Sequence, residues 1–124
     1  MSTKDKEKGK PQKGERLALF KAVFEKYQDK FELHGYAVAF KEDTLDDSVA
    51  CIQTDSDNFR ASVRVCNHKK EQENLEASAK HEAIHLLVAR FSELAENRHA
   101  SQQEIMACEE ELVRKLAFLI PDIE

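Results

Sequence analysis

Apolar residues recur with the spacing of an amphipathic helix in three segments, residues 15–33, 75–97 and 101–120. The first segment carries an aromatic stripe made of Phe20, Phe24, Tyr27 and Phe31. We expect this stripe to pack in the core. The second segment has no helix breaker along its length, and the third begins where Ser101 and Glu104 have the spacing of a capping box. The pattern therefore predicts three helices.

Between the first two helices the pattern changes to the two-residue period of β-strands. Residues 36–40 and 48–54 form two strand-like runs, residues 55–58 have the composition of a hairpin turn, and a third run covers residues 59–65. In this third run Phe59, Ala61, Val63 and Val65 alternate with Arg60, Ser62 and Arg64. Such a half-polar strand suits the edge of a sheet or its solvent-covered side. The predicted order is helix, three-stranded sheet, helix, helix, which is an α+β fold.

The composition indicates one domain behind a polar tail. The chain has 124 residues, enough for a single core without disulfides. Residues 1–15 contain no large apolar residue after Met1 and are rich in lysine, so we expect a disordered tail followed by one domain over residues 16–124. The formal net charge of -5 argues against a nucleic-acid-binding surface on the folded part.

The chain also lacks the signatures of membrane insertion and of a disulfide framework. No run of residues has the length and apolar character of a membrane span, and the N-terminus lacks the apolar segment of a signal peptide. Cys51, Cys66 and Cys108 are widely spaced and form no CxxC pair, so we expect buried reduced thiols. A cytoplasmic protein without a membrane partner fits these observations.

The sequence His81-Glu82-Ala83-Ile84-His85 is the feature with the clearest chemical meaning. Four residues of an α-helix advance by about 400°, so His81 and His85 share one face and could hold one tetrahedral ion. Glu82 lies about 100° away, where its carboxylate would flank a metal-bound water. The two histidines fall at the margin of the apolar stripe of their helix, where a cleft can open. The pattern predicts a Zn2+ site, which needs a third protein ligand for catalysis.

Two residues compete to be that third ligand, Glu109 and His99. On a helical wheel the last helix would bury a face made of Ile105, Leu112, Val113, Leu116 and Ile120. Glu109 falls in the middle of this face, where a carboxylate costs several kcal/mol unless Arg64, Arg90, a helix N-terminus or a metal neutralises it. His99 would lie about 20 Å from His85 if the motif helix runs straight. Glu109 would return only about 10 Å along a strictly antiparallel helix, so it requires an oblique crossing or an early end of the motif helix.

Two blocks of sequence resemble a known enzyme family. The block HEAIHLLVARFSELAENR and the closing EIMACEEELVRKLAFLI, behind three strand-like runs, are similar to the gluzincin branch of zinc peptidases. The likeness is strongest to very small metallopeptidases encoded in phage genomes, and it runs from about Leu17 to the C-terminus. A more distant similarity is to SprT-type proteases, whose third ligand is a histidine, a role that would fall here to His99.

The gluzincin resemblance implies a minimal zincin-like domain. It implies that His81, His85 and Glu109 bind Zn2+ and that Glu82 is the general base or acid. It also implies that the third strand is an edge of the sheet, along which an extended peptide could lie.

We therefore expect a zinc-dependent metallopeptidase that acts on a peptide or protein, in the host cytoplasm if the chain is phage-encoded. Zinc-activated water would attack the peptide bond with Glu82 as base. The donor for the oxyanion stays open among His34, Tyr36 and His68. The alternative is a non-catalytic zincin-like protein that attaches to a host or virion partner, because no second domain is present to form the far wall of a deep cleft.

Overall fold

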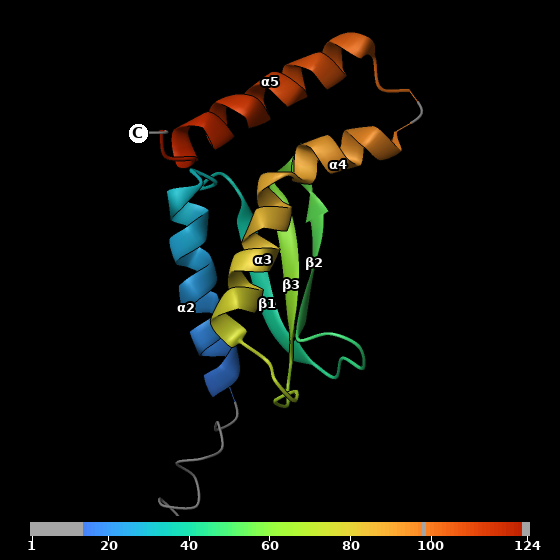
Figure 1. Ribbon diagram of the computed structural model, residues 1–124. Coiled ribbons are helices and arrows are strands. Elements are labelled where there is room, and N and C mark those ends of the chain that lie inside the picture. The colour runs from blue at the N-terminus through green and yellow to red at the C-terminus, as the bar shows by residue number, and fades with distance from the viewer. Residues whose placement is uncertain (1–13, 98, 123–124) are drawn as a thin grey trace, which may run out of the picture.

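The computed structural model describes residues 14–97 and 99–122 (Figure 1). The elements are α2 (Glu15–Lys30), β1 (Ala37–Asp43), β2 (Ala50–Asp55), the short 3-10 helix η1 (Ser56–Asn58), β3 (Arg60–Cys66), α3 (Leu75–Leu87), α4 (Ala89–Glu96) and α5 (Gln102–Leu119). The α+β class is confirmed. A disordered tail was expected over residues 1–15, and residues 1–13 of it lie outside the described residues. Within the described part no helix combines the length and apolar character needed to cross a membrane.

The three strands form one mixed sheet in the order β1-β3-β2. Strand β1 is parallel to β3, while β2 is antiparallel to β3 and joined to it through η1. The expectation that the third strand is an edge is therefore wrong, because β3 is the central strand and β1 and β2 are the edges. The polar residues of β3 alternate with buried ones because they face the side of the sheet that no helix covers.

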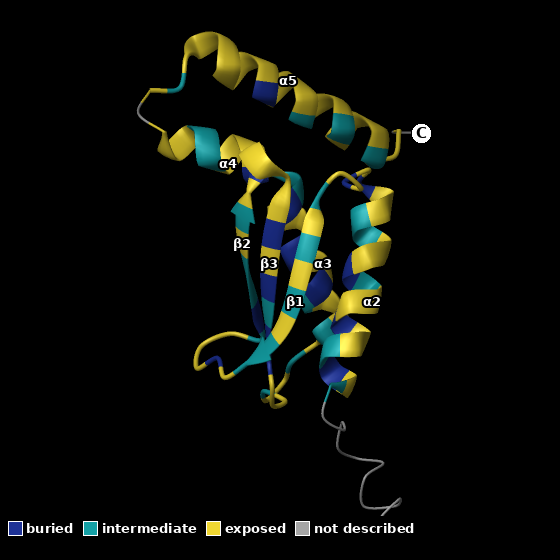
Figure 2. Cartoon of the chain, turned by 180° about the vertical axis from the view of Figure 1, so that it is seen from behind, coloured by how far each residue is buried: buried dark blue, intermediate teal, exposed yellow. Residues whose placement is uncertain are grey.

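Helices α2 and α3 cover the other face of the sheet and enclose the core (Figure 2). The predicted aromatic stripe is partly confirmed, since Phe20 and Phe24 are fully buried and Phe31 nearly so. From the sheet they meet Val63 and Val65 of β3, which are also buried. The core therefore lies between two helices and the central strand.

The second predicted helix is not continuous. It breaks at Val88 into α3 and α4, although no glycine or proline stands at this point. Glu93 of α4 accepts hydrogen bonds from the Thr54 hydroxyl at 2.8 Å and from the Ser56 N–H at 3.1 Å. These contacts tie α4 to the β2–β3 hairpin, and Ala89 is buried directly after the break. Tertiary contacts thus redirect a segment whose local sequence favours one straight helix.

The last helix begins as predicted but buries a different face. Ser101 and Glu104 form both hydrogen bonds of the capping box. Helix α5 crosses the end of the two-layer body beside α4 (Figure 1). Cys108 is buried and Leu112 is half-buried, whereas most of the face expected to be buried is exposed to solvent. All three cysteines are free, with Cys51 only half-buried.

A buried ion pair joins the start of α2 to the segment that leads into α3. Arg16 and Glu73 have side chains only 6% and 4% exposed, and the guanidinium donates two hydrogen bonds to the carboxylate. Arg16 also donates to the Cys66 carbonyl at 3.2 Å, and the Lys70 N–H donates to Glu73 at 2.8 Å. The Arg16 hydrogen bonds hold the pKa of Glu73 below its ordinary range. The pair therefore ties α2, the end of β3 and the approach to α3 together.

Replacing Glu73 with alanine should leave a buried guanidinium unpaired, and we expect the free energy of unfolding to fall by about 3–5 kcal/mol. Urea denaturation at neutral pH measures this loss. Asp43→Ala is the control, because it breaks the half-exposed pair with Arg64 and should cost less than about 1 kcal/mol. Equal losses in the two variants would contradict a special role for the buried pair.

Candidate functional site

The residues His81, Glu82 and His85 are positioned by the way α3 packs against the body. Asn74 caps the helix, its side chain accepting a hydrogen bond from the Ala77 N–H at 3.0 Å. Ala79 and Ala83 are completely buried against the sheet and α2, and Leu86 is nearly so. This face fixes the rotation of the helix, so that Glu82 is 7% exposed while both histidines are exposed to solvent.

The two imidazoles converge as expected. Their Nε2 atoms are 3.2 Å apart, and the ring centroids are 4.8 Å apart at an interplanar angle of 76°. Two nitrogen ligands of one tetrahedral zinc ion, each at about 2.0–2.1 Å from it, are separated by roughly 3.3 Å. The spacing also suits a hydrogen bond between two neutral rings. The geometry therefore fits two ligands of a single ion without rearrangement of either histidine.

Glu82 is the buried acid of the motif. Its carboxylate makes no hydrogen bond to another described residue, and it lines a groove that is open to solvent. Burial raises the pKa of Glu82 above its ordinary value of 4.5, and the nearby His81 and His85 oppose this rise. A carboxyl group with a raised pKa beside two imidazoles can accept and return a proton, as a general base and acid must do.

A groove of about 570 Å³ gives access to this site from the side of strand β2. Ser48, Val49 and Ala50 form one wall, at the start of β2. His81 and Glu82 stand on the opposite wall with Ala77 and Ser78 of α3, and residues 71–74 also line the groove. The sequence pattern does not predict that these residues form a wall of the site. Its only signal was the capping residue Asn74, which marks the turn of the chain into α3.

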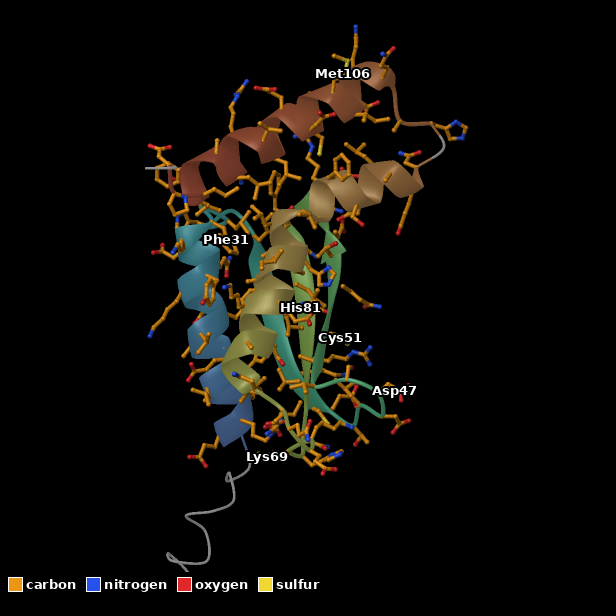
Figure 3. All side chains as sticks on the ribbon, in the orientation of Figure 1. Phe31, Asp47, Cys51, Lys69, His81 and Met106 are labelled. Atoms are coloured by element: carbon orange, nitrogen blue, oxygen red, sulfur yellow. The ribbon has the colours of Figure 1, made fainter. Side chains whose placement is uncertain are left out.

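A third ligand is not assembled beside the histidines. The described residues contain no group of three or more His, Cys, Asp or Glu side chains that could hold a metal ion. Figure 3 places His81 midway along α3, whereas α5, which carries Met106, crosses the end of the body. Glu109 is exposed on α5, and His99 is exposed in the turn that precedes it. The residues present thus fit two positions of a zinc ion and leave the third protein position unfilled.

The arginines considered as partners of Glu109 have other partners. Arg64 pairs with Asp43 at 3.3 Å, and Arg90 pairs with Glu111. The idea that either arginine neutralises Glu109 is therefore wrong for this arrangement. The carboxylate of Glu109 is instead compatible with the apolar face of α5 because that face is open to water.

The three side chains considered as oxyanion donors do not line the groove. His34 lies 3.4 Å from Asp29, and His68 contacts Asn67 and Cys66. Tyr36 lines a separate cavity of about 550 Å³ under α5. Burial raises the pKa of Tyr36, and the negative charges of nearby glutamates add to the rise. None of the three is placed to assist chemistry at His81 and Glu82 in this structure.

Comparisons with known proteins returned no match, since no protein-family model, curated protein sequence or solved structure is significantly similar to the chain. A function for the chain can therefore be inferred only from the residues of the site and their geometry.

Replacing Glu82 with glutamine should stabilise the metal-free protein at neutral pH. The pKa of Glu82 is higher in the folded protein than in the unfolded chain. The free energy of unfolding therefore falls as the pH rises through the window between these two pKa values. Above that window the free energy of unfolding of Glu82→Gln should exceed that of the wild type, and below about pH 4 the two should agree.

Chemical denaturation across this pH range, in the presence of a chelator, measures the difference. Glu25→Gln, which changes an exposed glutamate of α2, is the control and should show no such divergence. A Glu82→Gln protein less stable than the wild type at neutral pH would contradict the argument from burial.

Proposed function

We propose that the chain is a zinc-dependent peptidase whose metal is held by His81 and His85, with Glu109 as the third ligand. The observation that carries the proposal is the convergence of two imidazole Nε2 atoms to 3.2 Å beside a buried carboxylate. A structural pair of histidines does not require a neighbouring acid with a raised pKa, whereas a hydrolytic site does. The two features together favour hydrolysis.

Each residue of the motif has a definite task in this proposal. Zinc bound at the pair would supply a water of lowered pKa and would polarise a carbonyl group. Glu82 would take the proton of that water and deliver it to the leaving amine.

The substrate would be an extended peptide or protein segment lying beside strand β2. This strand is an edge of the sheet, and its first residue lines the groove that holds His81 and Glu82. An edge strand has backbone donors and acceptors that can pair with an extended chain. The edge beside the groove is thus β2 and not the third strand. For a phage-encoded chain the substrate would be met in the host cytoplasm.

A second candidate function is a non-catalytic binding protein that attaches to a host or virion partner. It is favoured by the incomplete ligand set around His81 and His85 in the described part of the chain. A second observation points the same way, because α5 exposes several large apolar residues that a partner could cover. In this reading the motif would keep a structural metal or none.

The two functions are separated by metal analysis combined with cleavage of a peptide library, with and without a chelator. For a peptidase we expect one equivalent of zinc and turnover that stops when the metal is removed. Glu82→Gln should retain the zinc and lower turnover by about 10²–10⁴-fold or more, because the proton acceptor is lost. His81→Ala should lose the metal itself.

His34→Ala is the matched control, because this exposed histidine lies in the loop before β1 and should change neither metal content nor turnover. Stoichiometric zinc without cleavage of any peptide would favour the binding protein. Undiminished turnover by Glu82→Gln would refute the catalytic assignment of that residue.

A further inference from the structure

A cavity of about 550 Å³ lies beneath helix α5, at the end of the body that this helix crosses. Its volume is within the range of roughly 300–1,000 Å³ that is usual for small-molecule sites. Tyr36 and Phe59 line it, with ring centroids 5.7 Å apart and an interplanar angle of 64°. Its apolar wall is made of Leu33, Leu86 and Leu87. This space, called the α5 cavity below, thus combines two aromatic rings with an apolar wall.

The charged side chains that line the α5 cavity leave an excess of negative charge. Arg90 and Glu111 neutralise each other in their ion pair. Glu32 and Asp57 also line the cavity, and their carboxylates make no hydrogen bond or ion pair with another described residue. Against these two free carboxylates stands one further basic group of the lining, the ammonium of Lys115. The cavity therefore favours a positively charged ligand.

The ring of Phe59 is directed by its backbone and not by burial. Phe59 is 57% exposed, and its φ of 53° lies in the left-handed region that a bulky residue rarely adopts. Its N–H donates to the Ser56 carbonyl at 3.3 Å, and its carbonyl accepts from the Ala37 N–H at 2.8 Å. These two hydrogen bonds fix the direction in which the ring leaves the chain. A glycine would suit this backbone better, so the exposed ring is kept at a cost to stability.

Glu32 is also held in a backbone conformation that favours glycine. It follows the end of α2 with a φ of 58°. Its N–H donates to the Asp29 carbonyl at 3.0 Å, and the Leu33 N–H donates to the Gln28 carbonyl at 2.9 Å, which are the two hydrogen bonds of a Schellman motif. Glycine is the usual residue at this place in the motif. The carboxylate of Glu32 is therefore not explained by the helix end that it occupies.

We propose that the α5 cavity binds an alkylguanidinium or alkylammonium group, the kind of group that ends an arginine or lysine side chain. The cation contacts the rings of Tyr36 and Phe59, because a positive charge within about 6 Å of an aromatic ring is attracted to its face. Glu32 and Asp57 balance its charge, and the apolar wall contacts its alkyl chain. The α5 cavity shares no lining residue with the groove at His81, so the inference does not depend on a metal or on hydrolysis.

Titration of the isotope-labelled protein with propylguanidinium chloride, followed by NMR, tests the site directly. We expect saturable shifts of the amide signals of Tyr36 and Phe59, with a dissociation constant of about 1 mM or below. Propylurea, which has a similar shape but no charge, should bind at least about tenfold more weakly.

A blocked Ala-Arg-Ala tripeptide and its neutral citrulline counterpart repeat the comparison with the same group on a polypeptide. Tighter binding of the arginine tripeptide than of propylguanidinium would identify a basic residue of a polypeptide as the ligand. Weaker binding would identify a small free cation. Either result supports the cation site, provided that the charged member of each pair binds more tightly than the neutral one.

Substitutions in the lining should change the affinity for propylguanidinium in opposite directions. Asp57→Asn should weaken binding by about two- to fivefold, and Phe59→Leu, which removes the aromatic face, by about two- to thirtyfold. Lys115→Met should tighten binding by about two- to fivefold, because it removes a like charge. Asp47→Asn is the matched control and should change nothing, since Figure 3 places Asp47 in a loop at the opposite end of the body from α5.

Glu32→Gly separates binding from folding. It should raise the urea midpoint of unfolding, because glycine suits the positive φ, and it should weaken propylguanidinium binding by about two- to fivefold. Gln72→Gly is the control, since Gln72 has a φ of 60° but lies outside the α5 cavity. It should raise the midpoint and leave binding unchanged.

Three results would overturn the inference. Propylurea that binds as tightly as propylguanidinium would show that charge is not recognised. Shifts confined to signals outside the α5 cavity, or no saturable shift at all, would show that the cavity does not bind such cations. Weaker binding by Lys115→Met would show that the ammonium of Lys115 attracts the ligand, and would point to an anion or a zwitterion instead.

Discussion

The close packing of α3 on the sheet and α2 is the constraint on which the site depends. Ala79 and Ala83 have no exposed surface, and their small side chains let the helix backbone approach its neighbours. Because the motif residues share one rigid helix, this contact decides the direction of all three at once. Glu82 is turned into the margin of the core, while His81 and His85 remain accessible to solvent. A larger residue at either alanine would change the rotation of the helix and with it the environment of each motif residue.

Two polar anchors keep α3 in that rotation from its two ends. Ahead of the helix, Glu73 accepts hydrogen bonds from Arg16, which also donates to the Cys66 carbonyl at the end of β3. Beyond its end, Glu93 holds α4 to the hairpin through Thr54 and Ser56. The second anchor explains the break at Val88, since α4 can reach the hairpin only by leaving the axis of α3. The break also changes the direction in which the chain carries α5 away from the histidines.

The sequence predicts those features that depend on local pattern. The strand order along the chain, the start of α3 after Asn74 and the capping box at Ser101 all follow from short-range signals, and the structure contains each of them. The break at Val88 carries no local signal, because it arises from hydrogen bonds to residues more than thirty positions earlier. The central position of β3 could not be predicted from the sequence either. A half-polar strand occurs both at the edge of a sheet and in a sheet with one uncovered face. The packed face of α5 was ambiguous because two of its sides are apolar.

The location of Glu109 affects which apolar side of α5 packs against the body. A carboxylate at the centre of an apolar stripe is well solvated while the stripe faces water, but burying the stripe would strip that hydration at a cost of several kcal/mol. Apolar burial alone favours turning the stripe inward, and desolvation of Glu109 opposes it. The outward position of the stripe is therefore the one that keeps the Glu109 carboxylate hydrated.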